Sequence, residues 1–325
     1  MKFLRKKELF QRLIFRVLNI FKIMAERISF HDQIQMNKIK SFSLIAVIFI
    51  FFIILGYVIS MILDPSYFFI TMIFAIIFSL IYVLAGYYNS DKISLASVRA
   101  KPASQTEHRM FYHAVESMSI ASGLPMPHLY VMESEEINAF ASGRNPQNAV
   151  ICFTTGALKK LNKQELEGVV AHEMSHIANY DIRFMTLTAV LIGMVSIIAQ
   201  MFLRNLWFAN VGRDRDGRME IFLIILGIIF AILAPIATQL VSLSISRKRE
   251  YMADATGVKF TRYPSGLANA LKKIKDEHVS EKERKHGVAK AMAPLFISDP
   301  FKRKARGLFS THPDIGDRIK KLEQM

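Results

Sequence analysis

The sequence predicts a mainly helical, multi-pass membrane protein that carries one small β-sheet outside the bilayer. Three observations lead to this prediction. Hydrophobic residues make up 52% of the 325 positions and charged residues only 21%, which excludes an intrinsically disordered chain. Four stretches contain no charged side chain, and each exceeds or equals the roughly 20 residues that cross about 30 Å of hydrocarbon as a helix. Short runs of β-forming residues lie between the second and third stretches.

The four uncharged stretches pair into two predicted helical hairpins. They are residues 41–63, 65–90, 184–203 and 221–246. The first two are dense in Ile, Phe and Leu, and only the Asp64-Pro65 turn separates them. The second pair is weaker because Gln200 and Pro235 interrupt it. Helices of this kind also form the core of soluble domains, so that alternative stays open for the second pair.

The positive charge of the chain predicts its orientation in the membrane. Lys and Arg number 42 against 27 Asp and Glu, a net charge of +15. Ten of them lie in residues 1–40, nine in 91–183 and nineteen in 247–325. Because such residues collect on the cytoplasmic side, two hairpins place all three segments in the cytoplasm. Orientation in the cell membrane thus explains the charge, and we expect no nucleic-acid partner.

These boundaries divide the chain into five parts. We predict a basic N-terminal extension at 1–40, a first hairpin at 41–90, a soluble domain in two parts at 91–183 and 247–325, and a second hairpin at 184–246. Apolar residues recur at helical spacing among the basic residues of the extension, a pattern typical of a helix lying on an anionic leaflet. A poorly ordered basic tail is the alternative. Cys152 is the only cysteine, which excludes an intramolecular disulfide.

The segment 91–183 has the pattern of a small mixed domain. Residues 112–119 predict a helix, and residues 128–132, 137–141 and 149–154 predict strands. Asn162 is a candidate N-cap, and Glu165 follows at the position of a capping box. We therefore expect a helix to begin after Asn162 and to run through residue 177.

That helix contains the pattern H-E-x-x-H at residues 172–176. Histidines four residues apart lie on one helical face, so His172 and His176 can bind a single Zn²⁺. Glu173 then stands where a general base for a water molecule is needed. A structural interpretation, a solvated helix face that carries these residues by chance, is the alternative.

A catalytic zinc site needs a third protein ligand. Ile182 occupies the position at which a third histidine of the metzincin type would stand, so that class is excluded. Glu250 is the first well-placed acidic residue after the predicted second hairpin. Asp254 lies one helical turn later, where it could accept the free ring N–H of a ligand histidine. A surface position for Glu250 in a basic patch is the alternative.

Several motifs together resemble the HtpX-type membrane zinc metalloproteases, gluzincins related to the prenyl-protein (CAAX) peptidase. The resemblance covers roughly residues 40–325. It rests on residues 137–143, 154–156, 172–181, the Glu250/Asp254 helix and residues 310–313. Cys152 and Phe153, and the long basic extension, depart from the pattern of the family, but neither touches the zinc motif.

The resemblance implies a zincin-like metalloprotease domain on the cytoplasmic side with one Zn²⁺ per chain. It implies the ligands His172, His176 and Glu250 and the base Glu173. It also implies an edge strand at Asn138, Ala139 and Phe140 that pairs with extended substrate. His312 would lie near the active site, where it could stabilise the transition state, and Arg318 could help there.

We expect a membrane-embedded zinc endopeptidase that cleaves misfolded or damaged membrane proteins in quality control. Its partners would be the lipid bilayer and membrane-protein or unfolded polypeptide substrates. A dedicated processing peptidase would need an enclosed chamber, for which four membrane segments are few. A non-catalytic scaffold with structural zinc is a further alternative, against which the intact Glu173 argues.

Overall fold

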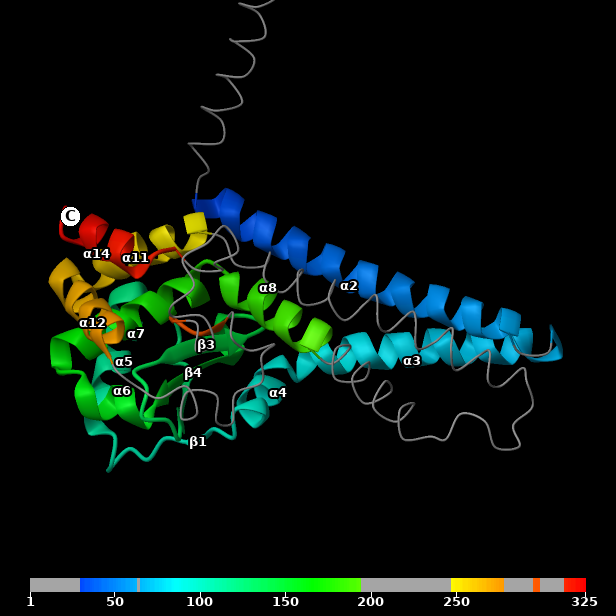
Figure 1. Ribbon diagram of the computed structural model, residues 1–325, viewed down its shortest axis with the longest axis horizontal. Coiled ribbons are helices and arrows are strands. Elements are labelled where there is room, and N and C mark those ends of the chain that lie inside the picture. Colours follow the sequence, from blue (N-terminus) through cyan, green and yellow to red (C-terminus); the bar gives the residue numbers. More distant parts are fainter. Residues whose placement is uncertain (1–29, 63–64, 194–246, 278–294, 299–312) are drawn as a thin grey trace, which may run out of the picture.

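The computed structural model describes residues 30–62, 65–193, 247–277, 295–298 and 313–325. The described chain consists of a pair of long helices and a globular part that contains the sheet (Figure 1). The helical pair extends from one side of the globular part. The N-terminal end of the first long helix lies back over the globular part, against helix α8 (Asp181–Leu187).

The long pair consists of α2 (Phe30–Ile62) and α3 (Phe68–Tyr88), joined through the 3₁₀ turn η1 (Pro65–Tyr67). The two helices touch closely at Gly56, where an added Cβ would collide with the Cβ of Ala75. This agrees with the predicted first hairpin. However, α2 begins at Phe30 and not at residue 41, so the predicted boundary at residue 40 falls inside a helix. Charged side chains do not stop a helix, since Lys and Glu are good helix formers. Residues 1–29 of the predicted extension lie outside the described residues.

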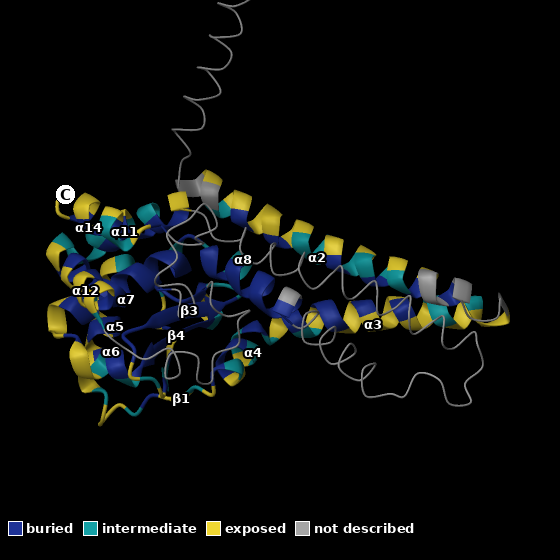
Figure 2. Cartoon of the chain, in the orientation of Figure 1, coloured by how far each residue is buried: buried dark blue, intermediate teal, exposed yellow. Residues whose placement is uncertain are grey.

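Apolar side chains cover the outer surface of this pair. Only 22% of the most apolar stretch of each helix is buried, and exposed positions run along both helices (Figure 2). Phe69 and Phe74 are 77% and 71% exposed. A core helix of a soluble domain would bury these side chains, because exposed apolar surface in water is costly. The pair therefore has the length and the surface of membrane-spanning helices.

The predicted second hairpin lies mostly outside the described residues, at 194–246. Its beginning is described as the end of α8 and one π-helical turn, η3 (Thr188–Ile192). This beginning packs against the first hairpin, since Leu187 and Leu191 are fully buried in a cluster with residues of α2 and α3. The Tyr82 hydroxyl donates to the Leu191 carbonyl at 2.6 Å. Two hairpins remain a prediction.

The sheet is mixed and has four strands in the order β1-β2-β4-β3. The strands are β1 (Lys101–Pro102), β2 (His128–Met132), β3 (Ala139–Gly143) and β4 (Ala149–Thr154). β2 and β4 are parallel, and the other two pairings are antiparallel. The ranges predicted for β2 and β4 match the structure.

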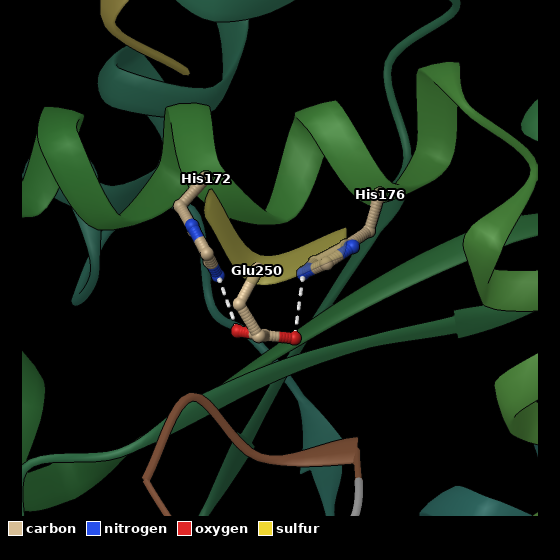
Figure 3. A group of neighbouring side chains, drawn as sticks. All are labelled: His172, His176 and Glu250. Carbon is tan, nitrogen blue, oxygen red and sulfur yellow. Dashed lines mark ion pairs between the residues drawn. The ribbon is translucent and has the colours of Figure 1, made fainter. Parts of the chain in front are cut away.

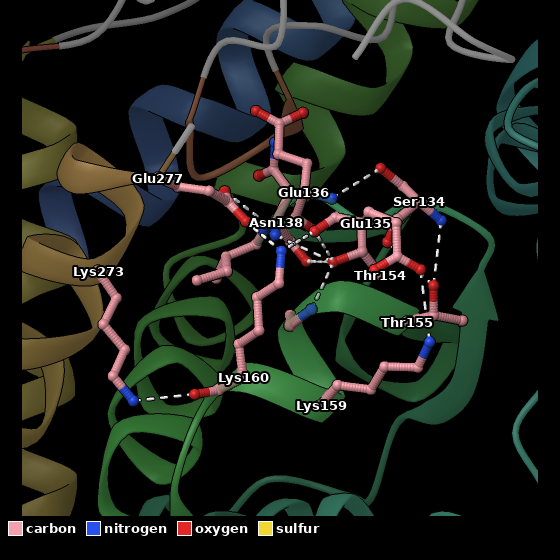
Figure 4. Close-up of polar contacts among 12 residues, drawn as sticks. Ser134, Glu135, Glu136, Asn138, Thr154, Thr155, Lys159, Lys160, Lys273 and Glu277 are labelled. Atoms are coloured by element: carbon pink, nitrogen blue, oxygen red, sulfur yellow. Dashed lines mark hydrogen bonds and ion pairs between the residues drawn. The ribbon is translucent and has the colours of Figure 1, made fainter. Parts of the chain in front are cut away.

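β3 begins two residues later than predicted because side chains take the backbone groups at its start. The Ile137 N–H donates to the Glu277 carboxylate at 2.9 Å, and the Asn138 N–H donates to Thr154 Oγ1 at 3.0 Å. Figure 4 shows these contacts in the polar network around the segment before β3. Lys160 Nζ holds Glu277 in place at 2.7 Å. The N–H groups of Ile137 and Asn138 therefore have hydrogen-bond acceptors without pairing to a neighbouring strand.

Helices enclose the sheet and each other. They are α4 (Ser90–Ser97), α5 (Arg109–Ser122), α6 (Thr155–Lys160), α7 (Lys163–Ala178), α8, α11 (Arg247–Thr261), α12 (Pro264–Asp276) and α14 (Ile315–Leu322). α7 lies at the centre and is buried from residue 168 to residue 177. Its N-terminus has the predicted capping box: Asn162 Oδ1 accepts from the Glu165 N–H at 3.0 Å, and Glu165 Oε2 accepts from the Asn162 N–H at 2.8 Å.

Gly168 allows α12 to approach the centre of α7. A Cβ at Gly168 would lie 2.5 Å from the Leu267 nitrogen and 2.8 Å from its Cα. Backbone atoms cannot move aside as the tip of a side chain can. The close packing of these two helices therefore depends on the absence of a side chain at this position.

We predict that Gly168→Val lowers the stability of the protein by roughly 1–3 kcal/mol, the usual effect of overpacking a core. Gln164→Ala, on the exposed side of the same helix, should change stability by no more than about 0.5 kcal/mol. Thermal unfolding of both variants in detergent measures the difference. Equal midpoints for Gly168→Val and the parent chain would contradict the packing described here.

Candidate metal centre

Three predicted ligands meet inside the globular part. His172 and His176 project from one face of α7 toward Glu250, which α11 supplies (Figure 3). Nε2 of His172 lies 3.6 Å from Glu250 Oε2, and Nε2 of His176 lies 3.8 Å from Glu250 Oε1. All three side chains are buried. In the described part of the chain, no other group of His, Cys, Asp and Glu has the spacing of a metal site.

The two helices come together at a glycine. A Cβ at Gly257 of α11 would lie 3.1 Å from the His172 backbone nitrogen on α7. The missing side chain lets α11 lie against α7 along the turn that carries His172. Glu250, two turns earlier on α11, is thereby brought over the gap between the two imidazoles.

Each imidazole is oriented by a buried carboxylate. Nδ1 of His172 lies 2.9 Å from Asp254 Oδ1, and Nδ1 of His176 lies 3.1 Å from Asp181 Oδ2. A proton on each Nδ1 satisfies these contacts, which leaves both Nε2 atoms as acceptors that face Glu250. Ligand atoms around a tetrahedral Zn²⁺ are about 3.3 Å apart. The donor set therefore fits zinc with one position open.

The charges around the site also fit a divalent cation. Two arginines contact the carboxylates, Arg249 through Asp181 at 3.9 Å and Arg318 through Asp254 at 2.7 Å. Four buried carboxylates surround the site: Glu173, Asp181, Glu250 and Asp254. Metal binding requires neutral imidazoles, and the four carboxylates, when ionised, then exceed the two guanidinium groups by two negative charges. A buried excess of charge is costly unless it is compensated, and a divalent cation compensates it.

The pKa values of the site follow from burial and from these partners. Burial alone would lower the pKa of His172, but Asp254 and Glu250 outweigh it and raise this pKa to about 9. Burial would raise the pKa of Asp254, but the Arg318 guanidinium and His172 lower it. Asp254 therefore stays ionised. The carboxylates that stabilise positive charge on His172 would also stabilise a metal ion at this place.

Glu173 is buried next to the ligands. Burial raises the pKa of Glu173, whereas the two histidines and a hydrogen bond from the backbone of Ala141 act in the opposite direction. A carboxyl group with a raised pKa takes up a proton more readily than an exposed one, as a general base requires. The position of Glu173 is thus suited to proton transfer.

Arg318 is buried and contacts the carboxylates of Asp254 and Glu250. From α14 its Nε donates to Asp254 Oδ2 at 2.9 Å and its Nη2 to Asp254 Oδ1 at 2.7 Å. Nη1 lies 3.7 Å from Glu250 Oε2. This fork holds Asp254 against His172. His312, predicted nearby, lies outside the described residues.

The predicted substrate edge is covered by another segment of the chain. The Ile297 N–H donates to the Ala139 carbonyl at 3.0 Å. The Asn138 side chain bonds both backbone groups of Ser298, at 2.9 and 3.3 Å, and the Phe140 ring contacts Phe296. β3 is an edge strand of the sheet, as predicted, and in this structure residues 296–298 occupy the beginning of that edge. Pairing of Asn138, Ala139 and Phe140 with substrate stays a prediction. A local pattern of β-forming residues cannot reveal what pairs with the strand.

One functional contact was missing from the sequence prediction. Asp181 lies within residues 172–181, but the sequence pattern did not reveal its contact with His176 Nδ1. Its contact depends on the turn between α7 and α8, where Tyr180 has a φ of 58°. His108, His113 and His128 take no part in the site.

Comparisons with known proteins identify the family of the chain. A model of peptidase family M48 matches residues 105–325, a range that includes His172, His176 and Glu250. A protease HtpX homolog of Thermoanaerobacter pseudethanolicus is 44% identical over 252 residues, covering 77% of this chain and 83% of the relative. One of Streptococcus mutans is 40% identical over 301 residues, covering 90% and 99%.

A solved structure is similar at a lower level. The crystal structure of S. mikatae Ste24p is 19% identical with a TM-score of 0.44, covering 90% of this chain and 67% of that one. The assignment rests on the sequence matches alone, because the family match spans more than half of the chain and the relatives match over most of their length. The chain belongs to peptidase family M48 and, within it, groups with the HtpX homologues.

Proposed function

We propose that this protein is a zinc-dependent endopeptidase of the cell membrane that cleaves misfolded or damaged membrane proteins. The observation that carries the proposal is the buried convergence of His172, His176 and Glu250, with Glu173 beside them. A structural zinc site usually has four protein ligands, whereas a catalytic one keeps a position for substrate or water. Three ligands with an adjacent carboxylate favour catalysis.

The residues of the chain supply the proton transfers. When bound, Zn²⁺ would polarise the scissile carbonyl and activate a water molecule. Glu173 would take the proton of the attacking water and then deliver it to the leaving amine. Asp254 and Asp181 would hold the two imidazoles in the tautomer with a free Nε2.

The position of the site supports substrates at the membrane. α2 packs directly against α8, the helix that follows α7. The site on α7 therefore lies beside the N-terminal end of α2, the first of the two apolar helices. Loops, tails and unfolded segments near the bilayer surface are within its reach. The Lys and Arg distribution supports a cytoplasmic location for the site. Hydrolysis of unfolded casein by the detergent-purified protein, with and without zinc, tests the activity directly.

We predict that Glu173→Gln keeps folding and zinc content but lowers turnover by at least about 100-fold, since general-base catalysis contributes about 10²–10⁴. Glu167→Gln on the same helix, which is only partly buried, is the matched control and should remain active. Casein hydrolysis and metal analysis provide the two measurements. Turnover within tenfold of the parent chain at full zinc occupancy would refute the role of Glu173 as base.

Replacing Glu250 should reduce zinc binding more than replacing Asp254. Glu250→Ala removes a ligand, and we expect loss of bound zinc, because two histidines alone hold it weakly. Asp254→Ala removes the partner of His172 and should weaken zinc binding roughly 10–100-fold while leaving some activity at high zinc. Metal content after dialysis measures both. Stoichiometric zinc and full turnover in Glu250→Ala would place the third ligand elsewhere, with His312 as the next candidate.

The orientation can be tested with epitope tags. We predict that tags at residue 1, within 91–183 and at residue 325 all lie in the cytoplasm, because these segments carry most of the Lys and Arg. Protease added to the outer face of intact spheroplasts should leave all three tags uncut. Cleavage of the 91–183 tag under these conditions would show the opposite orientation.

A further inference from the structure

α2 carries a buried amide on the face that lies against the turn between α7 and α8. Asn37 is 5% exposed. Its Nδ2 donates to Asp181 Oδ1 at 2.6 Å and to the Asn179 carbonyl at 3.1 Å. Only the NH₂ end of the amide can donate to two acceptors, so this orientation of the side chain is defined by its partners.

Asp181 connects this amide to a predicted metal ligand. One oxygen, Oδ1, accepts from Asn37, and the other, Oδ2, lies 3.1 Å from His176 Nδ1. Asp181 is fully buried. A carboxylate held at both oxygens cannot rotate without losing one of these hydrogen bonds, and a lost hydrogen bond to a buried charged group is costly. The orientation of His176 therefore depends on Asn37.

His172 is also held by a carboxylate that a third side chain fixes in place, but here that third side chain is an arginine. There Asp254 contacts His172, and Arg318 of α14 holds Asp254 through both of its oxygens. On the His176 side the nearest guanidinium nitrogen recorded for Asp181, Arg249 Nε, is 3.9 Å away, beyond hydrogen-bonding distance. Asn37 thus provides the short contact that Arg318 provides for Asp254.

α2 also supports the turn that places Asp181. The Lys38 ammonium lies 4.6 Å from the centre of the Tyr180 ring, and Tyr180 forms the left-handed turn between α7 and α8. Two neighbouring residues of α2 therefore contact three consecutive residues, 179–181, that follow the zinc helix.

We infer that Asn37 is a positioning residue of the metal centre, through which the first membrane-spanning helix orients His176. It fixes Asp181, and Asp181 fixes the imidazole in the tautomer whose free Nε2 faces Glu250. Zinc affinity then depends on the packing of α2 against α8. This inference rests on the proposed function only in taking His176 as a zinc ligand.

The test measures zinc affinity of the full-length chain in detergent by competition with a chromophoric chelator. Asp181→Ala should weaken zinc binding roughly 10–100-fold, and Asn37→Ala about tenfold, the lower end of the range for such partners. The double variant should bind zinc as Asp181→Ala does, because Asn37 acts through Asp181. Unchanged affinity in Asn37→Ala, or effects that add fully in the double variant, would overturn the inference.

Two further variants separate positioning from packing. Asn37→Leu keeps the branching and the number of heavy atoms of the side chain but has no donor, so it should lose as much zinc affinity as Asn37→Ala. Ser41→Ala removes a buried hydroxyl one turn further along α2, which donates to the Asn37 carbonyl of its own helix, and should bind zinc normally. Equal losses in Ser41→Ala and Asn37→Ala would show a packing effect and contradict the inference.

The visible spectrum of the Co²⁺-substituted protein adds a readout of ligand geometry. It should change in Asn37→Leu and stay as in the parent chain in Ser41→Ala. Thermal unfolding of the metal-free variants shows whether each one folds, and comparison of the Asn37 variants with Ser41→Ala decides the question even where Asp181→Ala does not fold. His176→Ala tests the underlying assumption separately: full zinc affinity in that variant would contradict the proposed metal site itself.

Discussion

The rest of the structure depends on one interaction, the contact of the buried Glu250 carboxylate with two imidazoles of another helix. α7 and α11 lie far apart in the sequence, and their contact at Gly257 brings this carboxylate to His172 and His176. A buried charge without partners is strongly unfavourable. The helix pairing is therefore coupled to the chemistry of the site: whatever balances the charge of Glu250 also stabilises the contact between the two parts of the domain.

Partners of the histidines extend this coupling to the ends of the described chain. Asp254 and Arg318 link His172 to the C-terminal helix α14, and Asp181 and Asn37 link His176 to α2. Each imidazole is thus held by a carboxylate, and each carboxylate by an anchor from a distant element. Outer partners of this kind orient metal ligands and tune their basicity. Through these contacts the candidate metal centre is linked to α2 of the apolar hairpin and to α14.

The sheet contributes the edge strand β3, whose beginning is covered by another segment of the chain. All five residues of β3 are buried, and residues 296–298 pair with its beginning. Covering an edge in this way protects its unpaired backbone groups from other strands. A polypeptide that reaches the metal centre must therefore either approach beside this segment or displace it, and the hydrogen bonds between Asn138 and Ser298 are the contacts that displacement would break.

Sequence patterns alone determined the local features of this protein, and the tertiary structure decided which of them meet. The capping box at Asn162, the spacing of His172 and His176, the ranges of β2 and β4 and the first apolar hairpin all depend on residues close together in the chain, where periodicity and hydrogen-bonding patterns are set by the backbone. Glu250 was a candidate ligand from the sequence because it is the first well-placed acidic residue after the predicted second hairpin. Its approach to the two histidines, however, depends on the packing of α11 against α7 at Gly257. The early start of α2, the late start of β3, the covered edge and the chain of contacts from Asn37 to His176 were not predictable in this way. Asn37 and Asp181 are 144 residues apart, and such polar contacts form only after the folded chain has brought two helix faces together and excluded water from between them.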